Sequence, residues 1–401
     1  MNRRRERLLS SSKEAAAQNN DQPSVESIMQ KSFPQEQMGA NNQMFCRATI
    51  RNQFFLDNVL QHCGEMTSQE ARQQQTKVEW ATEDQISKVD SVLKSVYRDW
   101  SAEGREERSV VYDKLLGALD RHLPLRTDDS AFNLPPKVAI PGSGLGRLAF
   151  EIYSKGYSSQ GSDFSLPMLL ASDFMLNGCS GQDPHQQFAI SPFLSETSNV
   201  KSLQHRLRTV MVPDTAAAGV SHDSDFKPDF SLLAGEFLSL YSHFLPGNCL
   251  DDDGSDSRNN EKFNAVVCSF FIDTAPSLPH YLITIYHMLE KGGLFINFGP
   301  LMWHWTGHGA VIPDDVDGAG DAHINQGDFI SANHKHRTNH LDQRYLQSVD
   351  FTWEETRSMI LNTGFEFLEE ELDITTRYTS DKLNMKKVQF DCIFFVARKV
   401  R

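Results

Sequence analysis

The chain has few cysteines, and their spacing gives them no recognisable role. Six occur among 401 residues, and no two are separated as Cys-x-x-Cys. That spacing is typical of structural zinc sites and of thiol–disulfide oxidoreductases, so neither class of protein is indicated. Cys268 and Cys392 lie in apolar runs that we expect to form buried strands. We therefore expect reduced thiols, as in a cytosolic or nuclear protein.

Long apolar runs are also missing. The longest falls far short of the ~20 residues that a membrane-spanning helix needs, and no apolar segment follows Met1. We expect neither a membrane span nor a secretory signal, and we place the protein in the cytoplasm. The basic cluster Arg3 to Arg5 leaves the nucleus open, although such short clusters usually belong to solvated tails.

Positive charge is in short supply. The chain has 39 Lys and Arg residues against 53 Asp and Glu residues, which gives a net charge of −14 at pH 7. Proteins that bind nucleic acid neutralise phosphates with a basic surface. A nucleic-acid substrate is therefore not expected.

The most informative segment that is present is a glycine-rich turn. Residues 137–147 read KVAIPGSGLGR, so a short apolar strand leads into Gly142, Gly144 and Gly146. Apolar residues at helical spacing follow the turn. A strand, a glycine turn and a helix together form a cradle for a nucleoside cofactor at a helix N-terminus. Asp163 stands 21 residues after Gly142, where its carboxylate could accept hydrogen bonds from ribose hydroxyls.

The spacing of the glycines bears on which cofactor binds. The third glycine follows the second after one residue, whereas the dinucleotide fingerprint G-x-G-x-x-G has two residues there. The observed G-x-G-x-G spacing is commoner in folds that bind S-adenosylmethionine, which has no pyrophosphate. An NAD-linked dehydrogenase remains a distant alternative.

Seven segments are expected to form strands of one sheet. They are the run from Lys137, Tyr157 to Gly161, Phe230 to Phe237, Phe263 to Ile272, Gly293 to Phe298, Phe365 to Ile374 and Val388 to Ala397. No helix separates the last two, so they should pair as an antiparallel hairpin. The predicted fold class is α/β: a Rossmann-like methyltransferase sheet, mostly parallel with an antiparallel C-terminal strand, plus an N-terminal helical region.

The pattern along the chain predicts three parts. Residues 1–44 are polar and should be disordered. Residues 45–130 should form helices, at Cys46 to Met66, Glu83 to Trp100 and Ser109 to Leu123, that cap the cofactor site. Residues 131–401 should form the sheet domain, with irregular loops at residues 183–227 and loop insertions at residues 245–261 and 306–349.

The second insertion holds five histidines at irregular spacing, namely His308, His323, His334, His336 and His340. Structural metal sites need fixed ligand geometry, so we expect a solvated loop and no metal. Because the loop follows the fifth predicted strand, it could also fold over a substrate as a lid.

Several blocks of sequence are similar to those of a known family. PGSGLGRLAFEI, QGSDFS, AGEF, SFFIDTA, LEKGGLFINFGPLMWH and DCIFFVARK together resemble the carnosine N-methyltransferase family, from Lys88 to the C-terminus with gaps. The resemblance implies an S-adenosylmethionine-dependent enzyme that methylates an imidazole nitrogen of a small dipeptide. Two alternatives stay open: methylation of a protein histidine, with the acidic surface attracting a basic partner, and a non-catalytic cofactor-binding protein. A homodimer also stays open.

The resemblance and the strand ends together suggest cofactor contacts. Ligands in such sheets bind beyond the carboxyl ends of the strands. Glu236 is expected to meet the adenine amine and Phe237 the face of the base, although the family has Asp at the first position. Ser269 stands where the family has a Cys that contacts the cofactor. Arg98 corresponds to an Arg that binds the methionine carboxylate, but the family's Gln three residues earlier is Ser95 here.

Asp273 is the strongest candidate for work on the substrate. A neutral imidazole has one N–H and one lone-pair nitrogen. A carboxylate that accepts from the N–H fixes the tautomer and stabilises the cation formed by methylation. The alternative is a helix N-cap, because Asp273 precedes a predicted helix. The next strand end supplies His304, which could bind the dipeptide carboxylate or the ring, or simply pack between Trp303 and Trp305.

One further substrate residue follows from the resemblance. The family's dipeptide-contacting Tyr aligns with Phe390, so a hydroxyl is missing there. Its loss could shift preference toward another histidine-containing dipeptide or a peptide histidine. Tyr378 is a candidate to replace it.

Overall fold

The structure is a computed structural model. It describes residues 32, 34–64, 81–125, 134–179, 188–217, 220, 227–246, 262–304, 349–379 and 381–400. Most of the predicted disordered tail, nearly all of both predicted insertions, and the five histidines of the second one lie outside these residues. Within them, no helix combines the length and apolar composition that crossing a membrane requires.

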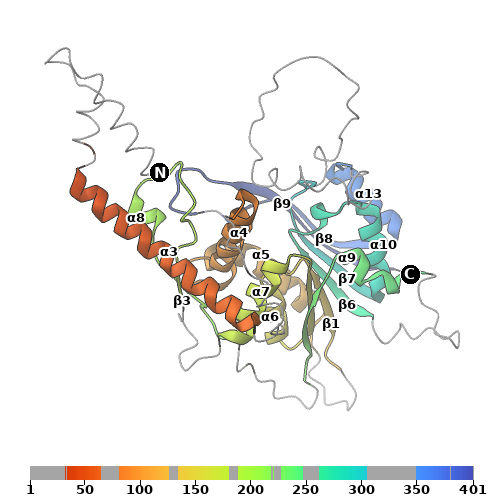
Figure 1. Ribbon diagram of the computed structural model, residues 1–401. Coiled ribbons are helices and arrows are strands. Elements are labelled where there is room, and N and C mark those ends of the chain that lie inside the picture. The colour runs from red at the N-terminus through yellow and green to blue at the C-terminus, as the bar shows by residue number, and fades with distance from the viewer. Residues whose placement is uncertain are drawn as a thin grey trace, which may run out of the picture.

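A seven-stranded sheet forms the centre of the molecule, in the order β5-β2-β1-β6-β7-β9-β8 (Figure 1). The strands are β1 (Lys137–Pro141), β2 (Ser158–Asp163), β5 (Phe230–Ala234), β6 (Phe263–Ser269), β7 (Leu289–Gly299), β8 (Phe365–Arg377) and β9 (Gln389–Lys399). The first five in the spatial order pair in parallel, whereas β9 is antiparallel to both β7 and β8. The predicted mostly parallel sheet with an antiparallel C-terminal strand is confirmed.

The central strands owe their place to continuous apolar sequence. In β6, residues 265–268 are completely buried, and in β1 Val138, Ala139 and Ile140 are at most 1% exposed. Side chains alternate between the two faces of a strand, so burial of every residue requires cover on both faces. These two strands therefore occupy the middle of the sheet, and their C-terminal ends lie at the centre of its ligand-binding edge.

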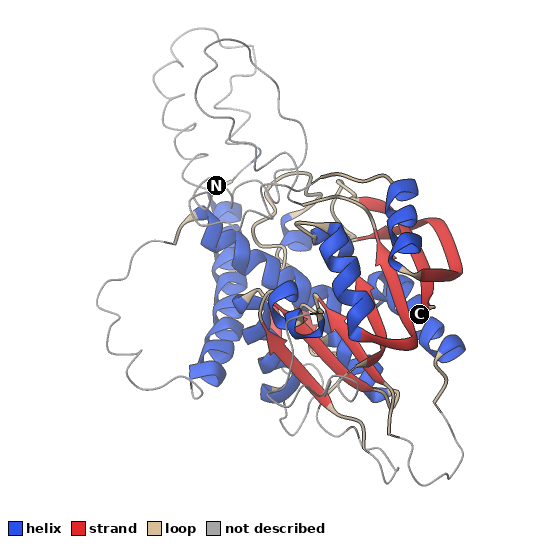
Figure 2. Ribbon diagram, turned by 90° about the vertical axis from the view of Figure 1, so that its right-hand side faces the viewer, coloured by secondary structure: helices blue, strands red, loops and turns tan. Residues whose placement is uncertain are grey.

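Helices cover both faces of the sheet (Figure 2). On one face, α5 (Arg105–His122) and α6 (Arg147–Ser154) pack through Leu115 and Leu148 onto Val138 and Ile140 of β1. The other face is covered by α9 (Phe237–Leu240), α10 (Leu278–Met288) and α13 (Trp353–Thr363). The last of these ends at Gly364, which has the left-handed conformation that favours glycine at a helix C-terminus.

Helices α3 (Gln35–Gly64) and α4 (Glu83–Trp100) precede the sheet domain. A capping box between Thr82 and Gln85 starts α4 at the predicted residue. The prediction for α3 is wrong at its start, because the helix begins at Gln35, inside the stretch expected to be disordered. Its buried residues begin at Ala48, and adding turns to an anchored helix avoids the cost of nucleation.

A second, two-stranded sheet lies where the sequence predicts irregular loops. Strands β3 (Phe188–Ile190) and β4 (Val210–Val212) pair antiparallel, with the short helix α8 (Leu203–Arg206) between them. Three-residue strands are too short to show an alternating pattern, which explains why they were missed. The side chain of Asn52 on α3 bonds the backbone N–H and C=O of Ser191 at 2.7 and 2.9 Å, and so ties this sheet to the N-terminal helix.

Candidate active site

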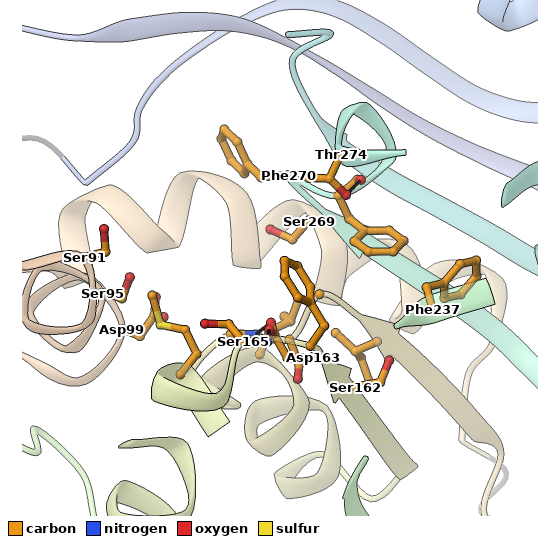
Figure 3. Close-up of a pocket in the computed structure, with 18 of the residues that line it drawn as sticks. Ser91, Ser95, Asp99, Ser162, Asp163, Ser165, Phe237, Ser269, Phe270 and Thr274 are labelled. Atoms are coloured by element: carbon orange, nitrogen blue, oxygen red, sulfur yellow. Dashed lines mark hydrogen bonds between the residues drawn. The ribbon is translucent and has the colours of Figure 1, made fainter. Parts of the chain in front are cut away.

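A cavity of about 1100 Å³ opens at the C-terminal ends of β5, β2, β1 and β6, between these strand ends and helix α4. Figure 3 shows its walls: Ser91, Ser95 and Asp99 of α4 on one side, and Phe237 across the hollow from them. The predicted site residues that line it are Arg98, Gly142, Gly144, Asp163, Glu236, Phe237, Ser269 and His304. The structure thus brings together residues from six separate parts of the chain.

The glycine turn is held by the end of the neighbouring strand. The N–H of Ser143 donates to the C=O of Ser162 at 2.9 Å, and the N–H of Gly144 donates to Asp163 Oδ2 at 2.9 Å. Asp163 Oδ1 accepts from the N–H of Ser165 at 2.8 Å. Burial raises the pKa of Asp163, while these N–H groups act in the opposite direction. Asp163 therefore shapes the turn in addition to facing the cavity.

Two of the glycines in the turn have positive φ, and each lacks a side chain for a different reason. At Gly142 (φ 67°) a Cβ would lie 2.5 Å from Cδ2 of Phe271, so close packing by that ring excludes a side chain. At Gly144 (φ 54°) a Cβ would meet nothing within 4 Å, because the residue borders open cavity. The missing side chain at Gly144 therefore leaves space for a ligand to approach the backbone.

Glu236 has one carboxylate oxygen to offer a ligand. It is the N-cap of α9, and its Oε2 accepts from the backbone N–H and the hydroxyl of Ser239, both at 2.9 Å. Its Oε1 is buried and has no hydrogen-bond partner among the described residues. A buried acceptor without a partner is costly, and a donor such as an exocyclic amine would satisfy it.

Aromatic rings flank the same end of the cavity. Phe237 packs against Phe271 and Tyr281, with ring centroids 5.3 and 4.7 Å apart. Phe164, which follows Asp163 directly, lines the cavity and is 69% exposed. Sequence reasoning missed Phe164. An apolar residue directly after the acid at a strand end would have been the signal.

Arg98 lines the cavity but already has a partner. Its guanidinium donates to both carboxylate oxygens of Asp99, at 2.7 and 2.9 Å, and to the hydroxyl of Thr379 at 3.0 Å. It also lies 4.8 Å above the ring of Tyr378. Ser95, one turn earlier on α4, lines the cavity as well. Asp99 was not predicted, and its pairing with its own neighbour could not be seen from spacing alone.

Asp273 lies in a short 3₁₀ turn, Ile272–Thr274, directly after β6. The N-cap of α10 is Ser277, so Asp273 does not cap that helix. Its Oδ2 accepts from the N–H of Met302 at 3.1 Å, and its backbone C=O accepts from the N–H of His304 at 3.0 Å. The side chain is almost fully buried behind the cavity wall, whereas Thr274 and His304 border the cavity.

The electrostatics of Asp273 follow from this position. Burial raises the pKa of the Asp273 carboxyl, and the charge of His304 and the N–H of Met302 lower it by less. The carboxyl therefore ionises less readily than an exposed aspartate. A group of this kind can accept a hydrogen bond, and it takes up a proton more readily than an exposed aspartate does.

Phe390 does not lie where the resemblance suggests. It is absent from the cavity lining and packs against the core that contains Cys392 and Phe394. Because side chains alternate along β9, Phe390 shares their face of the sheet. Tyr378 lines the cavity instead, with its ring stacked on that of Phe270 at 4.5 Å. The loop after β8 therefore brings a hydroxyl to the site that Phe390 cannot supply.

Metal-ligating side chains do not converge in the described ranges: no group of three or more His, Cys, Asp or Glu residues is arranged to hold an ion there. The five histidines of the second predicted insertion fall outside those ranges. Cys268 and Cys392 are buried free thiols, and burial raises the pKa of the Cys392 thiol to about 12. Neither thiol is poised to act as a nucleophile.

Similar proteins were sought by sequence and by structure. A family model described as carnosine N-methyltransferase matches residues 75–401. A carnosine N-methyltransferase from Rattus norvegicus is 29% identical over 315 residues, covering 78% of this chain and 63% of that protein. One from Schizosaccharomyces pombe is 31% identical over 315 residues, covering 79% of this chain and 71% of that protein. The chain thus spans less than two thirds of the length of the rat relative.

Solved structures with a similar fold include other methyltransferases. One is the magnesium protoporphyrin IX methyltransferase of Synechocystis PCC 6803, 10% identical, with a TM-score of 0.33 over 80% of this chain and 90% of that chain. Another comes from Galdieria sulphuraria and is provisionally described as a sarcosine dimethylglycine methyltransferase. It is 11% identical, with a TM-score of 0.36 over 72% of this chain and 85% of that chain.

The family match extends over the α4 helix, the glycine turn, the whole sheet and both strand ends that carry Asp273 and His304. The fold and the family together identify S-adenosylmethionine as the cofactor. The chain belongs to the carnosine N-methyltransferase family.

Proposed function

We propose that this protein transfers a methyl group from S-adenosylmethionine to an imidazole nitrogen of carnosine or a related histidine-containing dipeptide. The observation that carries the proposal is the placement of Asp273. Its buried carboxyl lies directly behind the wall of the cofactor cavity, is fixed by the N–H of Met302, and is joined through the backbone to His304. An imidazole at this wall would reach a hydrogen-bond acceptor once the residues between Asp273 and the cavity moved aside.

The cavity residues fit the cofactor. The open space beside Gly144 accommodates the methionine part, and Asp163 offers lone pairs to the ribose hydroxyls. The unpartnered Oε1 of Glu236 is placed to accept from the adenine amine, beside the ring of Phe237. When bound, the cofactor supplies a methyl group on a positively charged sulfur. The Arg98–Asp99 pair would have to open, or bind jointly, to engage the methionine carboxylate.

The protein's own residues then act on the substrate. Asp273 accepts a hydrogen bond from one ring nitrogen, so that the other nitrogen keeps its lone pair and points at the methyl carbon. This nitrogen forms the new bond as the carbon–sulfur bond breaks, with that electron pair staying on sulfur. The ring is then positively charged, and its N–H proton passes to Asp273, whose raised pKa suits it to that task, and onward to water.

The test is an assay with the purified full chain. The protein is incubated with S-adenosylmethionine labelled in the methyl group and with carnosine, and in parallel with a cell lysate freed of small molecules. We expect label in methylated carnosine, identified by mass spectrometry. Label in protein histidines but not in carnosine would contradict the proposal and support a protein substrate.

A further inference from the structure

Four cationic side chains line the cavity: Lys88, Arg98, Arg108 and Arg377. Two of them are neutralised within the protein. Arg98 is bidentate to Asp99, and Arg108 pairs with the buried Asp214. Arg377 has no carboxylate within ion-pair distance anywhere in the described part of the chain. Arg377 as a whole residue is half-buried and Lys88 is exposed, so Arg377 is the less solvated of the two cations left over.

Arg377 is the last residue of β8, and it lines both the cofactor cavity and a smaller pocket beside it. The next residue, Tyr378, stacks on Phe270, which follows β6 directly. Figure 3 shows Phe270 and Thr274 across the hollow from Asp163 and Ser165. Through the stacking of Tyr378 on Phe270, Arg377 is anchored next to the wall that includes the Asp273 turn.

Three glutamates, Glu103, Glu106 and Glu107, line a small neighbouring pocket together with Arg377, and two of them are engaged elsewhere. Glu107, which also lines the cavity, accepts from the backbone N–H of Thr379, and Glu103 pairs with Arg208. Lys387 adds a positive charge nearby. Burial is the larger cause that lowers its pKa, and the charge of Arg377 lowers it further. A half-buried guanidinium fork with no carboxylate bound to it in the described part of the chain favours an anion that can accept two parallel hydrogen bonds.

We propose that Arg377 binds the free carboxylate of the substrate and thereby makes the site selective for histidine compounds that end in a carboxylate. The inference rests on the proposed function, because it assigns one contact within that reaction. Carnosine has one carboxylate, attached to the carbon that carries the imidazolylmethyl group. A ring held at Asp273 would place this carboxylate a few bonds away, in the cavity that Arg377 also lines. A histidine inside a protein chain has no such group.

The experiment compares two substrates that differ only in that group. Carnosine is compared with β-alanylhistamine, in which hydrogen replaces the carboxylate. In the wild-type protein we expect kcat/KM to favour carnosine by roughly 10–100-fold, the range for hydrogen bonds to a charged group. Arg377→Gln should lower kcat/KM for carnosine by a similar factor, mainly through KM. For β-alanylhistamine, kcat/KM should stay within about twofold of the wild-type value.

A matched control is Lys382→Gln. Lys382 lines the small neighbouring pocket that it shares with Arg377 but not the cofactor cavity, so the substitution removes the same charge close by without touching the substrate. It should leave kcat/KM for both substrates within about twofold of the wild-type values. Binding of S-adenosylmethionine, measured by calorimetry, should be unchanged in Arg377→Gln, which also shows that the variant is folded.

Three results would overturn the inference. Equal losses for both substrates would mean that Arg377 supports the structure and not the carboxylate. A raised KM for S-adenosylmethionine would assign Arg377 to the cofactor. If the active wild-type protein and Arg377→Gln had the same ratio of kcat/KM for the two substrates, Arg377 would have no role in selecting between them. A wild-type protein inactive on both substrates would instead refute the proposed function, and the inference with it.

Discussion

The backbone N–H of His304 donates to the backbone C=O of Asp273 at 3.0 Å, and Asp273 Oδ2 accepts from the N–H of Met302 in the same segment. The two residues follow β6 and β7, which are neighbours in the sheet with Ser269 opposite Phe298. These bonds join two strand ends into one unit. A carboxyl group that must hold an imidazole in one orientation gains the rigidity of the sheet from this arrangement.

The first prediction concerns the charge of Asp273. Asp273→Asn keeps the shape of the side chain but can present an N–H to the ring, which would stabilise the wrong tautomer. We expect turnover of carnosine to fall by about 10²–10⁴, the range for a positioned general base, with S-adenosylmethionine affinity unchanged. Asp391→Asn changes an exposed carboxyl on β9 and should leave turnover normal. A fully active Asp273→Asn would rule out the proposed role.

The same variant makes a prediction about stability. The folded pKa of Asp273 is raised by burial, so the native state binds its proton more tightly than the unfolded chain does. Stability is therefore lost as the pH rises from the pKa of Asp273 in the unfolded chain to its higher pKa in the folded protein. Above the folded pKa the loss is complete. Asn is neutral at every pH. Asp273→Asn should thus melt no lower than the wild type at pH 7 in differential scanning calorimetry, and a clearly lower Tm would mean that the charge stabilises the fold.

The second site prediction concerns Asp163. Asp163→Ala removes a charged acceptor from the cavity and also frees the N–H groups of Gly144 and Ser165 that it now holds. Each hydrogen bond to a charged group is worth roughly 1.5–3 kcal/mol, so cofactor affinity should fall at least tenfold in calorimetry. Asp163→Asn keeps one acceptor oxygen and should lose less. Unchanged affinity in both variants would remove Asp163 from the cofactor site.

The glycine turn allows two substitutions to be compared. Gly144→Ala places a methyl group in open cavity at the cost of a strained φ of 54°, so it should weaken S-adenosylmethionine binding while Tm falls only slightly. Gly142→Val would collide with Phe271 and should lower Tm markedly as well. If Gly144→Ala bound the cofactor as tightly as the wild type, the space beside Gly144 would not be part of the site.

A buried ion cluster behind the site predicts sensitivity to acid. Asp214 accepts from Arg147 at 2.6 Å and from Arg108, and these arginines also donate to the backbone C=O groups of Asp99 and Arg98. Burial alone would raise the pKa of Asp214, but the two arginines lower it below its ordinary value. The stabilisation is therefore complete above the unfolded pKa and is lost as the pH falls through the folded one.

Removing that charge should be costly. Asp214→Asn leaves two buried arginines without their shared partner, and we expect a loss of about 3–5 kcal/mol at pH 7 in urea unfolding. The difference from the wild type should shrink as the pH falls from about 4, the ordinary aspartate pKa, toward the lower pKa of folded Asp214. Asp120→Asn breaks an exposed pair with Lys155 and should cost at most about 1 kcal/mol. If Asp214→Asn lost as little stability as this control, the buried ion cluster would not stabilise the fold as predicted.

Much of the fold could be predicted because its signals are local. A capping box starts α4, Gly364 ends α13, and the unbroken apolar run in β6 places that strand at the centre of the sheet. The absence of a helix between β8 and β9 predicts the antiparallel hairpin. The sites at Gly142, Asp163, Glu236 and Asp273 follow from the same reasoning, because the ends of parallel strands must converge at one edge.

Other features depend on contacts between residues far apart in sequence. The sequence by itself determined the sheet, its strand ends and the cofactor class, since these come from periodicity and from a turn whose positive φ values favour glycine. Only the tertiary structure decided that Tyr378 and not Phe390 reaches the cavity, that Arg98 is neutralised by Asp99, and that Arg377 is left without a carboxylate. Ion pairs and the direction of a side chain after a loop are set by packing in three dimensions, and no local pattern encodes them.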